Sequence, residues 1–197
     1  MTADAPLRTA PDFDLSRFLG SWFEIATLPV PQGRTLHDAA IADPSEWSTY
    51  TYSPRPDGRL DVLHRTGQND ATRADTGASI DAAPARATRV RAQPRVLRGV
   101  AQAGGGDGTD RAKLCIEFPP FRAEYWVIGV DPDYEWAVIG EPARRYLWLV
   151  ARTPYVPDDV FDQMLRVAAG HGYETSALQR VPAALPDDGS RAGDHLR

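Results

Sequence analysis

Apolar and polar residues alternate along most of the chain between Trp22 and Arg152. A period of two is typical of β-strands with one buried face, whereas a helix repeats its apolar positions every three to four residues. The alternation predicts strands over residues 22–29, 47–54, 59–66, 95–103, 111–118, 124–131, 134–141 and 146–152. Asp57-Gly58 and Asp131-Pro132 lie between such runs and are typical of tight turns. Neighbouring strands are therefore expected to run antiparallel.

One convincing helix follows the last of these strands, in the segment "PDDVFDQMLRVAAGHGY". Pro157 suits the first helical position, and the two aspartates after it complement the positive end of the helix dipole. Gly170 or Gly172 can end the helix. Its apolar stripe, at helical spacing, consists of Val160, Met164 and Val167. We expect this stripe to pack against the outside of a sheet.

Eight consecutive antiparallel strands and one helix favour an all-β fold in which the sheet closes into an up-and-down barrel, because closure removes exposed strand edges. The helix is then expected to pack outside the barrel. A barrel of this size encloses either packed side chains or one small ligand. The chain has 197 residues, which suits one domain, expected over 12–183 with a short last strand at 179–183. Residues 1–11 and 184–197 are expected to be flexible ends.

Charge and composition narrow the classes of partner. The formal net charge of -5 argues against a general nucleic-acid binder. The segment "RATRVRAQPRVLR", residues 86–98, is locally cationic and could meet an acidic partner or an anionic membrane surface, although a solvated strand face is the simpler interpretation. Peripheral membrane contact therefore stays open, as does the choice between monomer and homodimer.

No run of roughly 18 apolar residues occurs, so no membrane-spanning helix is expected. The start "MTADAPLRTAPDFD" lacks the basic and apolar regions of a secretory signal, which favours a cytoplasmic location. A periplasmic or outer-membrane location is the alternative if a leader has been removed. The single cysteine, Cys115, fits a reducing compartment.

Three segments resemble, in order, the three sequence motifs of the lipocalin family, in the branch that contains bacterial outer-membrane lipocalins and apolipoprotein D. "LGSWFEIA" resembles the first motif with Gly20 and Trp22, "VDPDYEWAVIG" the second with Asp131 and Tyr134, and "YLWLVARTP" the third with Arg152. The likeness covers most of residues 12–183. It implies that the turn at Gly20 leads the chain across the closed end of the barrel, where Trp22 forms the floor and Arg152 stacks over the indole.

The resemblance also divides the strands into inner and outer faces. With Trp22 pointing inward, alternation places Glu24 and Ala26 inside and Phe23 and Ile25 outside. A buried carboxylate needs partners or a proton. Glu24 is therefore either a proton donor or anchor in the cavity, or a carboxylate that is hydrogen-bonded to tyrosines and backbone at the base.

Matching the remaining strands to the family pattern implies a mostly apolar ligand site with a few polar contacts. Phe121 is expected at the entrance. Tyr146 and Trp148 either add to the aromatic wall of the cavity or belong to a filled aromatic core. The residues expected to contact the ligand are Tyr52, Val62, His64, Glu124, Trp126, Ile128, Phe121, Tyr146 and Trp148. The long connections at about 30–46 and 67–94 are expected to set specificity, and the second is expected either to be mobile or to fold over the ligand as a lid.

The resemblance implies a non-enzymatic carrier or store of a small hydrophobic molecule, such as a fatty acid, a lysophospholipid or a comparable amphiphile. One alternative is a lipocalin-fold isomerase or cyclase in which Glu24, Glu124 or His64 acts as acid or base. Another is a haem or tetrapyrrole binder that uses His64. No cofactor or metal site is expected, since His37, His171 and His195 lack metal-ligand spacing.

Overall fold

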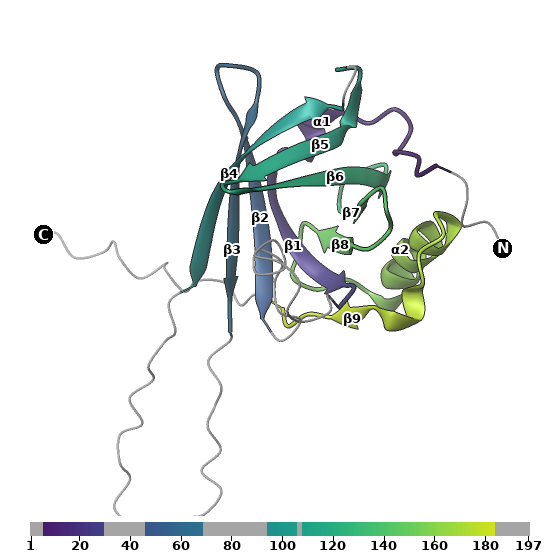
Figure 1. Ribbon diagram of the computed structural model, residues 1–197. Helices are drawn as coiled ribbons and strands as arrows, with labels where there is room; N and C mark the ends of the chain where they lie inside the picture. The colour runs from purple at the N-terminus through teal and green to yellow at the C-terminus, as the bar shows by residue number, and fades with distance from the viewer. Residues whose placement is uncertain (1–5, 30–45, 69–93, 106–107, 184–197) are drawn as a thin grey trace, which may run out of the picture.

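The computed structural model describes residues 6–29, 46–68, 94–105 and 108–183, and Figure 1 shows how they are arranged. The helical elements are α1 (Leu15–Phe18), α2 (Asp158–Gly170) and the short 3₁₀ helix η1 (Thr175–Ala177). The strands are β1 (Gly20–Thr27), β2 (Trp47–Pro54), β3 (Leu60–Gly67), β4 (Arg95–Gly104), β5 (Asp110–Phe118), β6 (Phe121–Val130), β7 (Trp136–Gly140), β8 (Leu147–Ala151) and β9 (Gln179–Arg180). Among the described residues, no helix is long and apolar enough to cross a membrane.

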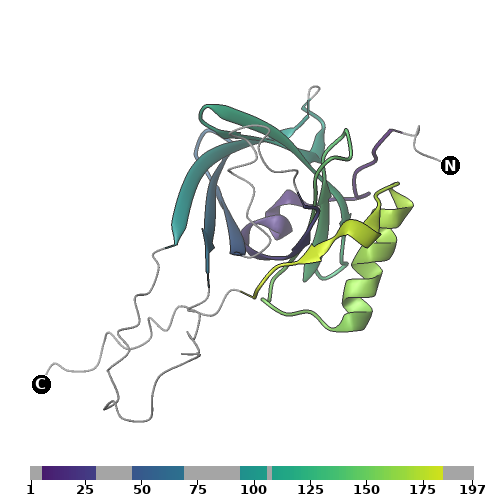
Figure 2. The same cartoon turned by 60° about the horizontal axis from the view of Figure 1, so that its bottom comes forward.

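The strands form one antiparallel sheet that closes on itself. Its order is β2-β3-β4-β5-β6-β7-β8-β1-β9, and a further pairing of β1 with β2 completes the ring. The short β9 pairs with β1 at Ala26 and Thr27 and lies outside the ring. Figure 2 looks into the barrel and shows α1 across its far end and α2 against its outer wall. The expected eight-stranded up-and-down barrel with one helix outside is confirmed.

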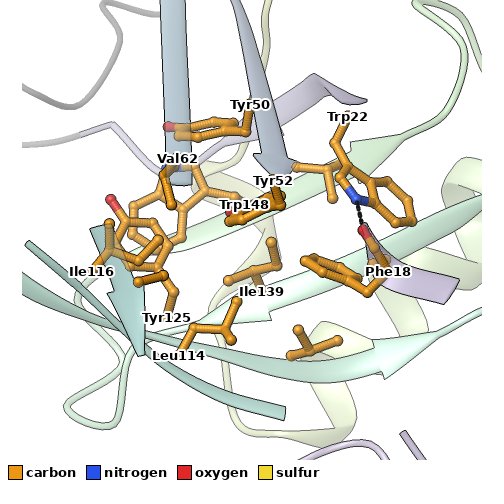
Figure 3. Packing of buried hydrophobic residues seen from close by; sticks show 14 of the residues in the cluster. Phe18, Trp22, Tyr50, Tyr52, Val62, Leu114, Ile116, Tyr125, Ile139 and Trp148 are labelled. Atoms are coloured by element: carbon orange, nitrogen blue, oxygen red, sulfur yellow. Dashed lines mark hydrogen bonds between the residues drawn. The ribbon is translucent and has the colours of Figure 1, made fainter. Parts of the chain in front are cut away.

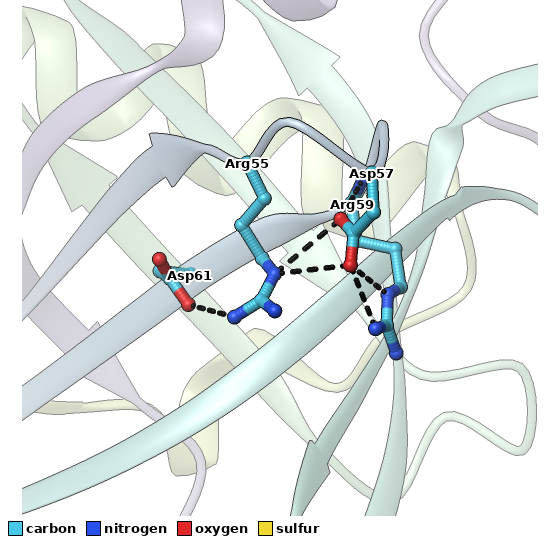
Figure 4. A network of polar contacts seen from close by, with 4 residues as sticks. All are labelled: Arg55, Asp57, Arg59 and Asp61. Atoms are coloured by element: carbon cyan, nitrogen blue, oxygen red, sulfur yellow. Dashed lines mark hydrogen bonds and ion pairs between the residues drawn. The ribbon is translucent and has the colours of Figure 1, made fainter.

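A charged network holds the turn between β2 and β3, as Figure 4 shows. The Asp57 carboxylate accepts hydrogen bonds from the guanidinium groups of Arg55 and Arg59, and Arg55 Nη1 also bonds Asp61 at 2.7 Å. Hydrogen bonds from Arg59 lower the pKa of Asp57 to about 2. Gly58 supplies a φ of 81°, which the turn requires. The Asp-Gly pair therefore closes a hairpin, as its sequence predicts.

Helix α2 covers the outer side of the barrel where β6 and β7 pass beneath it. Met164 of the predicted apolar stripe is fully buried, as is the neighbouring Ala168, while Val160 and Val167 of the stripe are partly buried. Two strand glycines allow the close approach: a Cβ on Gly129 would lie 2.5 Å from Val167, and a Cβ on Gly140 would lie 2.3 Å from Tyr173 Oη. These distances leave no room for a larger residue.

Two register irregularities change which side chains point inward. In β1 the pairing with β8 shifts between Glu24 and Ala26, so that Glu24 stands opposite Val150 of the inner cluster and Ala26 opposite Leu149 of the outer one. The expectation that Ala26 faces the interior is wrong, because the bulge turns it outward. The second irregularity lies in β6, between Val127 and Gly129.

Candidate functional site: the barrel interior

The interior of the barrel is lined mainly by aromatic and branched aliphatic side chains. Tyr50 and Tyr52 come from β2, Val62 from β3, Tyr125 from β6 and Trp148 from β8. Figure 3 shows these side chains together with Leu114, Ile116 and Ile139. Tyr125 and Trp148 stack with ring centroids 4.6 Å apart. Such a wall suits an apolar molecule held by few polar contacts.

One end of the interior is closed by a floor built around Trp22. The indole is fully buried, stacks on Phe18 at 4.9 Å and donates a hydrogen bond to the Phe18 carbonyl at 2.8 Å. On its other side the Arg152 guanidinium lies 3.7 Å from the ring centroid. Arg152 also donates to the carbonyl oxygens of Ser21 and Arg17, at 2.9 and 2.7 Å. The guanidinium therefore joins β8 to β1 and α1 at the closed end.

Helix α1 completes the floor, although no sequence pattern predicts it, since a helix of four residues is too short to show periodicity. The Asp14 carboxylate caps it by accepting from Ser16 N at 2.8 Å. The Asp14 amide donates to the hydroxyl of Tyr134 at 2.6 Å. Asp131, which starts the same turn as Tyr134, accepts from the Asp133 amide at 3.0 Å. The motif residues Asp131 and Tyr134 thus hold the floor rather than line the cavity.

Glu24 is the carboxylate of the interior, two residues after the floor tryptophan. Its side chain is 2% exposed, and burial raises its pKa from 4.5 to about 7. The nearby hydroxyls of Ser48 and Thr27 act against this rise in pKa, but both are engaged elsewhere: Ser48 pairs with His64, and Thr27 donates to the Leu147 carbonyl. Within the described chain both carboxyl oxygens lack a partner.

His64 lies on the same inner wall, on β3. It is 1% exposed and stacks on Tyr50, with ring centroids 4.3 Å apart and ring planes 2° apart. Its Nε2 is 2.9 Å from Ser48 Oγ, and its Nδ1 has no partner among the described residues. Burial, and to a lesser extent the charge of Arg95, lower its pKa to about 4. His64 is therefore neutral at physiological pH.

Several residues expected at the ligand site do line the interior. Tyr52, Val62, His64 and Trp148 are all buried on the inner face. Tyr146 is half-buried against the inner cluster, and its ring lies 6.0 Å from that of Trp148. Phe121 is half-buried opposite Phe118, at the turn between β5 and β6. Their contact with a ligand stays a prediction.

Three other expected residues point the opposite way. Glu124 and Trp126 pair with Cys115 and Lys113 on the outer face of β5, while Ile128 packs in the outer cluster beside α2. Trp126 Nε1 donates to Glu124 at 3.1 Å, and Lys113 Nζ lies 4.5 Å from the ring centroid. The expected inward facing of Glu124, Trp126 and Ile128 is wrong, since a shift of one residue in an alternating strand exchanges its two faces.

The inward residues of β6 are instead Tyr125 and Val127, which the sequence interpretation missed. The alternation separates these two residues from Glu124 and Trp126 but does not show which face is inside, because both faces of β6 carry large apolar residues. Ser48 and Tyr50 also belong to the inner wall, on the same face as Tyr52. The period of two in "STYTY" identifies that face.

The outward side of β4 to β6 carries a polar pocket of about 230 Å³. Glu124 lines it together with Cys115 and Arg122, whose Nε lies 2.7 Å from the sulfur. Across the described parts of the chain, no group of three or more His, Cys, Asp or Glu side chains is placed to hold a metal ion.

Comparison with known proteins places this architecture in a family. A family model described as "Lipocalin-like domain" matches residues 13–104 and 84–183. The outer membrane lipoprotein Blc of Escherichia coli K12 is 32% identical over 168 residues, which is 84% of this chain and 76% of that protein. Temperature-induced lipocalin-1 of Arabidopsis thaliana is 29% identical over 191 residues, covering 92% of this chain and 86% of the relative. Apolipoprotein D of Mus musculus is 20% identical over 89% of this chain and 80% of its own length.

Solved structures agree in fold. Insecticyanin from the tobacco hornworm Manduca sexta matches with a TM-score of 0.58 at 16% identity, over 92% of this chain and 85% of that chain. The cockroach allergen Per a 4 matches with a TM-score of 0.57 at 12% identity, over 89% and 92%. The closed barrel, the Trp22–Arg152 floor and the sequence matches together show that this chain belongs to the lipocalin family.

Proposed function

We propose that the chain binds and carries a small hydrophobic molecule inside the barrel, without changing it chemically. The observation that carries this proposal is the inner wall of Tyr50, Tyr52, Tyr125 and Trp148, closed at one end by Trp22. Membership of the lipocalin family supports it, because lipocalins bind small hydrophobic molecules. The ligand that we propose is a fatty acid, a lysophospholipid or a comparable amphiphile.

The energetics of such a complex are favourable. Burying roughly a dozen methylene groups at about 0.8 kcal/mol each supplies about 10 kcal/mol before the loss of ligand freedom is subtracted. The floor adds little to affinity, since Arg152 and Trp22 are already paired with each other and with backbone. Affinity therefore depends on the apolar length of the ligand.

The test is native mass spectrometry of the purified protein, followed by extraction and identification of any released lipid. A fluorescence titration with palmitate and lysophosphatidylcholine complements it. Trp148 lies on the inner wall and Trp126 on the outer, so saturable quenching is expected to persist in Trp126→Phe and to fall sharply in Trp148→Phe. A protein with no bound lipid and no saturable quenching would overturn the carrier proposal.

An acid–base enzyme on the same barrel is the second candidate. The observation that favours it is Glu24, a fully buried carboxyl group whose pKa of about 7 suits proton transfer near neutral pH. Glu24→Gln separates the two: an isomerase or cyclase loses turnover but still binds its substrate, whereas a carrier shows no turnover in either form.

A further inference from the structure

Four inward-facing side chains have polar atoms without a hydrogen-bond partner in the described structure. The unpartnered atoms are the two carboxyl oxygens of Glu24, the Tyr50 hydroxyl, Nδ1 of His64 and Nε1 of Trp148. Buried polar groups are nearly always paired, because leaving one unpaired is costly. A concentration of such atoms in the interior of a binding protein therefore points to a polar group of the ligand.

Three of these side chains lie on adjoining strands: Glu24 on β1, Tyr50 on β2 and His64 on β3. Tyr50 stands opposite Trp22 across β1 and β2, and the His64 ring stacks on it at 4.3 Å. Glu24 follows Trp22 by two residues on the same inward face of β1, and Trp22 stands opposite Tyr50, so Glu24 and Tyr50 lie on neighbouring strands of the inner wall. Trp148, which stacks on Tyr125 at 4.6 Å, belongs to the same inner wall on β8. We call Glu24, Tyr50, His64 and Trp148 the deep polar cluster.

The inner wall beside this cluster is open to solvent on one side. Leu97 pairs with His64 across β3 and β4 and therefore shares its inward face, yet it is 38% exposed. The unpartnered atoms themselves are closed off from solvent. A ligand that reaches them therefore has to displace an inner-wall ring such as that of Tyr50.

The chemistry of the cluster selects the ligand group. Tyr50 and Trp148 offer O–H and N–H donors, while the Glu24 carboxyl offers acceptor oxygens. A hydroxyl group both donates and accepts, so it can satisfy partners of both kinds. A ligand carboxylate would place a second negative charge beside Glu24, and a quaternary ammonium group has no donor at all.

We propose that the deep polar cluster binds a neutral hydroxyl group at the leading end of an otherwise apolar ligand. The ligand then lies with its polar end toward the Trp22 floor and its apolar body toward the open end. Long-chain and terpenoid alcohols are molecules of this class. The proposal rests on the carrier function proposed above and adds both the ligand class and its orientation.

The test compares two probes of equal chain length, 1-decanol and 1-methoxydecane, which differ in the ability to donate a hydrogen bond. Each is titrated into the full chain, with binding followed by tryptophan fluorescence and by native mass spectrometry. We expect 1-decanol to bind about tenfold more tightly, the ratio that corresponds to one lost hydrogen bond of about 1.4 kcal/mol. Decanoate at pH 8 is expected to bind more weakly than 1-decanol.

Two variants test whether the deep polar cluster causes the preference for 1-decanol over 1-methoxydecane. Glu24→Leu is expected to bring the two affinities within about twofold while the affinity for 1-methoxydecane persists. Glu124→Leu, which removes a carboxylate from the outer face, is the matched control and keeps the tenfold preference. Equal binding of the two probes by the unaltered chain, or an unchanged preference in Glu24→Leu, would overturn the proposal. Failure of every probe to bind would instead refute the carrier function itself.

Discussion

Replacement of Glu24 by glutamine should change how stability depends on pH. Burial raises the pKa of Glu24 from 4.5 to about 7, so the folded state holds this proton more tightly than the unfolded state. Below pH 4.5 both states are protonated and the group has no effect. As the pH rises from 4.5 to about 7, the Glu24 carboxyl group ionises first in the unfolded chain, and the free energy of unfolding therefore decreases. Each unit of difference between the folded and unfolded pKa corresponds to about 1.4 kcal/mol, so the free energy of unfolding decreases by roughly 3 kcal/mol.

The ionisation of His64 has the opposite effect on stability over nearly the same pH range. Burial lowers its pKa from 6.5 to about 4, so its contribution to stability is present above pH 6.5 and is lost as the pH falls toward 4. The two effects largely cancel in the unaltered protein, whose stability should vary little across this range through these two groups. Glu24→Gln removes one of them and leaves a profile in which stability rises with pH.

The assay is urea unfolding of the unaltered protein and Glu24→Gln at intervals from pH 4.5 to 8. We expect the free energy of unfolding of the variant, relative to the unaltered chain, to increase by about 3 kcal/mol across this range. Glu24→Leu should show the same pH-dependent gain, which separates ionisation from the loss of any specific contact. Two stability curves that stay parallel across the whole range would refute the reasoning.

Three further predictions concern the frame and the histidine. Gly140→Ala should lower the free energy of unfolding by about 1–3 kcal/mol, since its Cβ would lie 2.3 Å from Tyr173 Oη, whereas Gly170→Ala, with open space around it, should have no such cost in the same urea assay. Arg152→Met should cost about 2 kcal/mol through the lost stacking on Trp22 and the lost backbone hydrogen bonds, and thermal unfolding that matches the unaltered protein would contradict this. His64→Gln should leave the effect of Glu24 unopposed, so that the free energy of unfolding decreases as the pH rises from 4.5 to about 7, and chemical denaturation at those two pH values measures the change.

Most of the fold could be predicted from the chain alone. The period of two located all eight barrel strands to within about three residues at their ends, and helical spacing located α2. Closure of the sheet into a barrel could be predicted because exposed strand edges are unfavourable. The three lipocalin motifs predicted the floor of Trp22 and Arg152. The segments expected to control specificity, around 30–46 and 67–94, fall largely outside the described residues.

The inward face of β6 could not be predicted in the same way. On β2 the outward positions are small and polar, so the alternation shows directly that Tyr50 and Tyr52 face inward. On β6 both faces are apolar, because one faces the interior and the other meets α2 and Lys113. Alternation then shows that the faces differ but not which one is inside. This ambiguity explains the error over Trp126 and Ile128.

The sequence by itself therefore determined the element types, the barrel and the family, because these depend on local periodicity and short motifs. Only the tertiary structure decided the register of β1 and β6, where a bulge in each strand reverses the faces beyond it. It alone also brought together Glu24, Tyr50, His64 and Trp148, which come from four strands. Whether a buried polar atom finds a partner depends on side chains far away in the chain, and no local pattern records that.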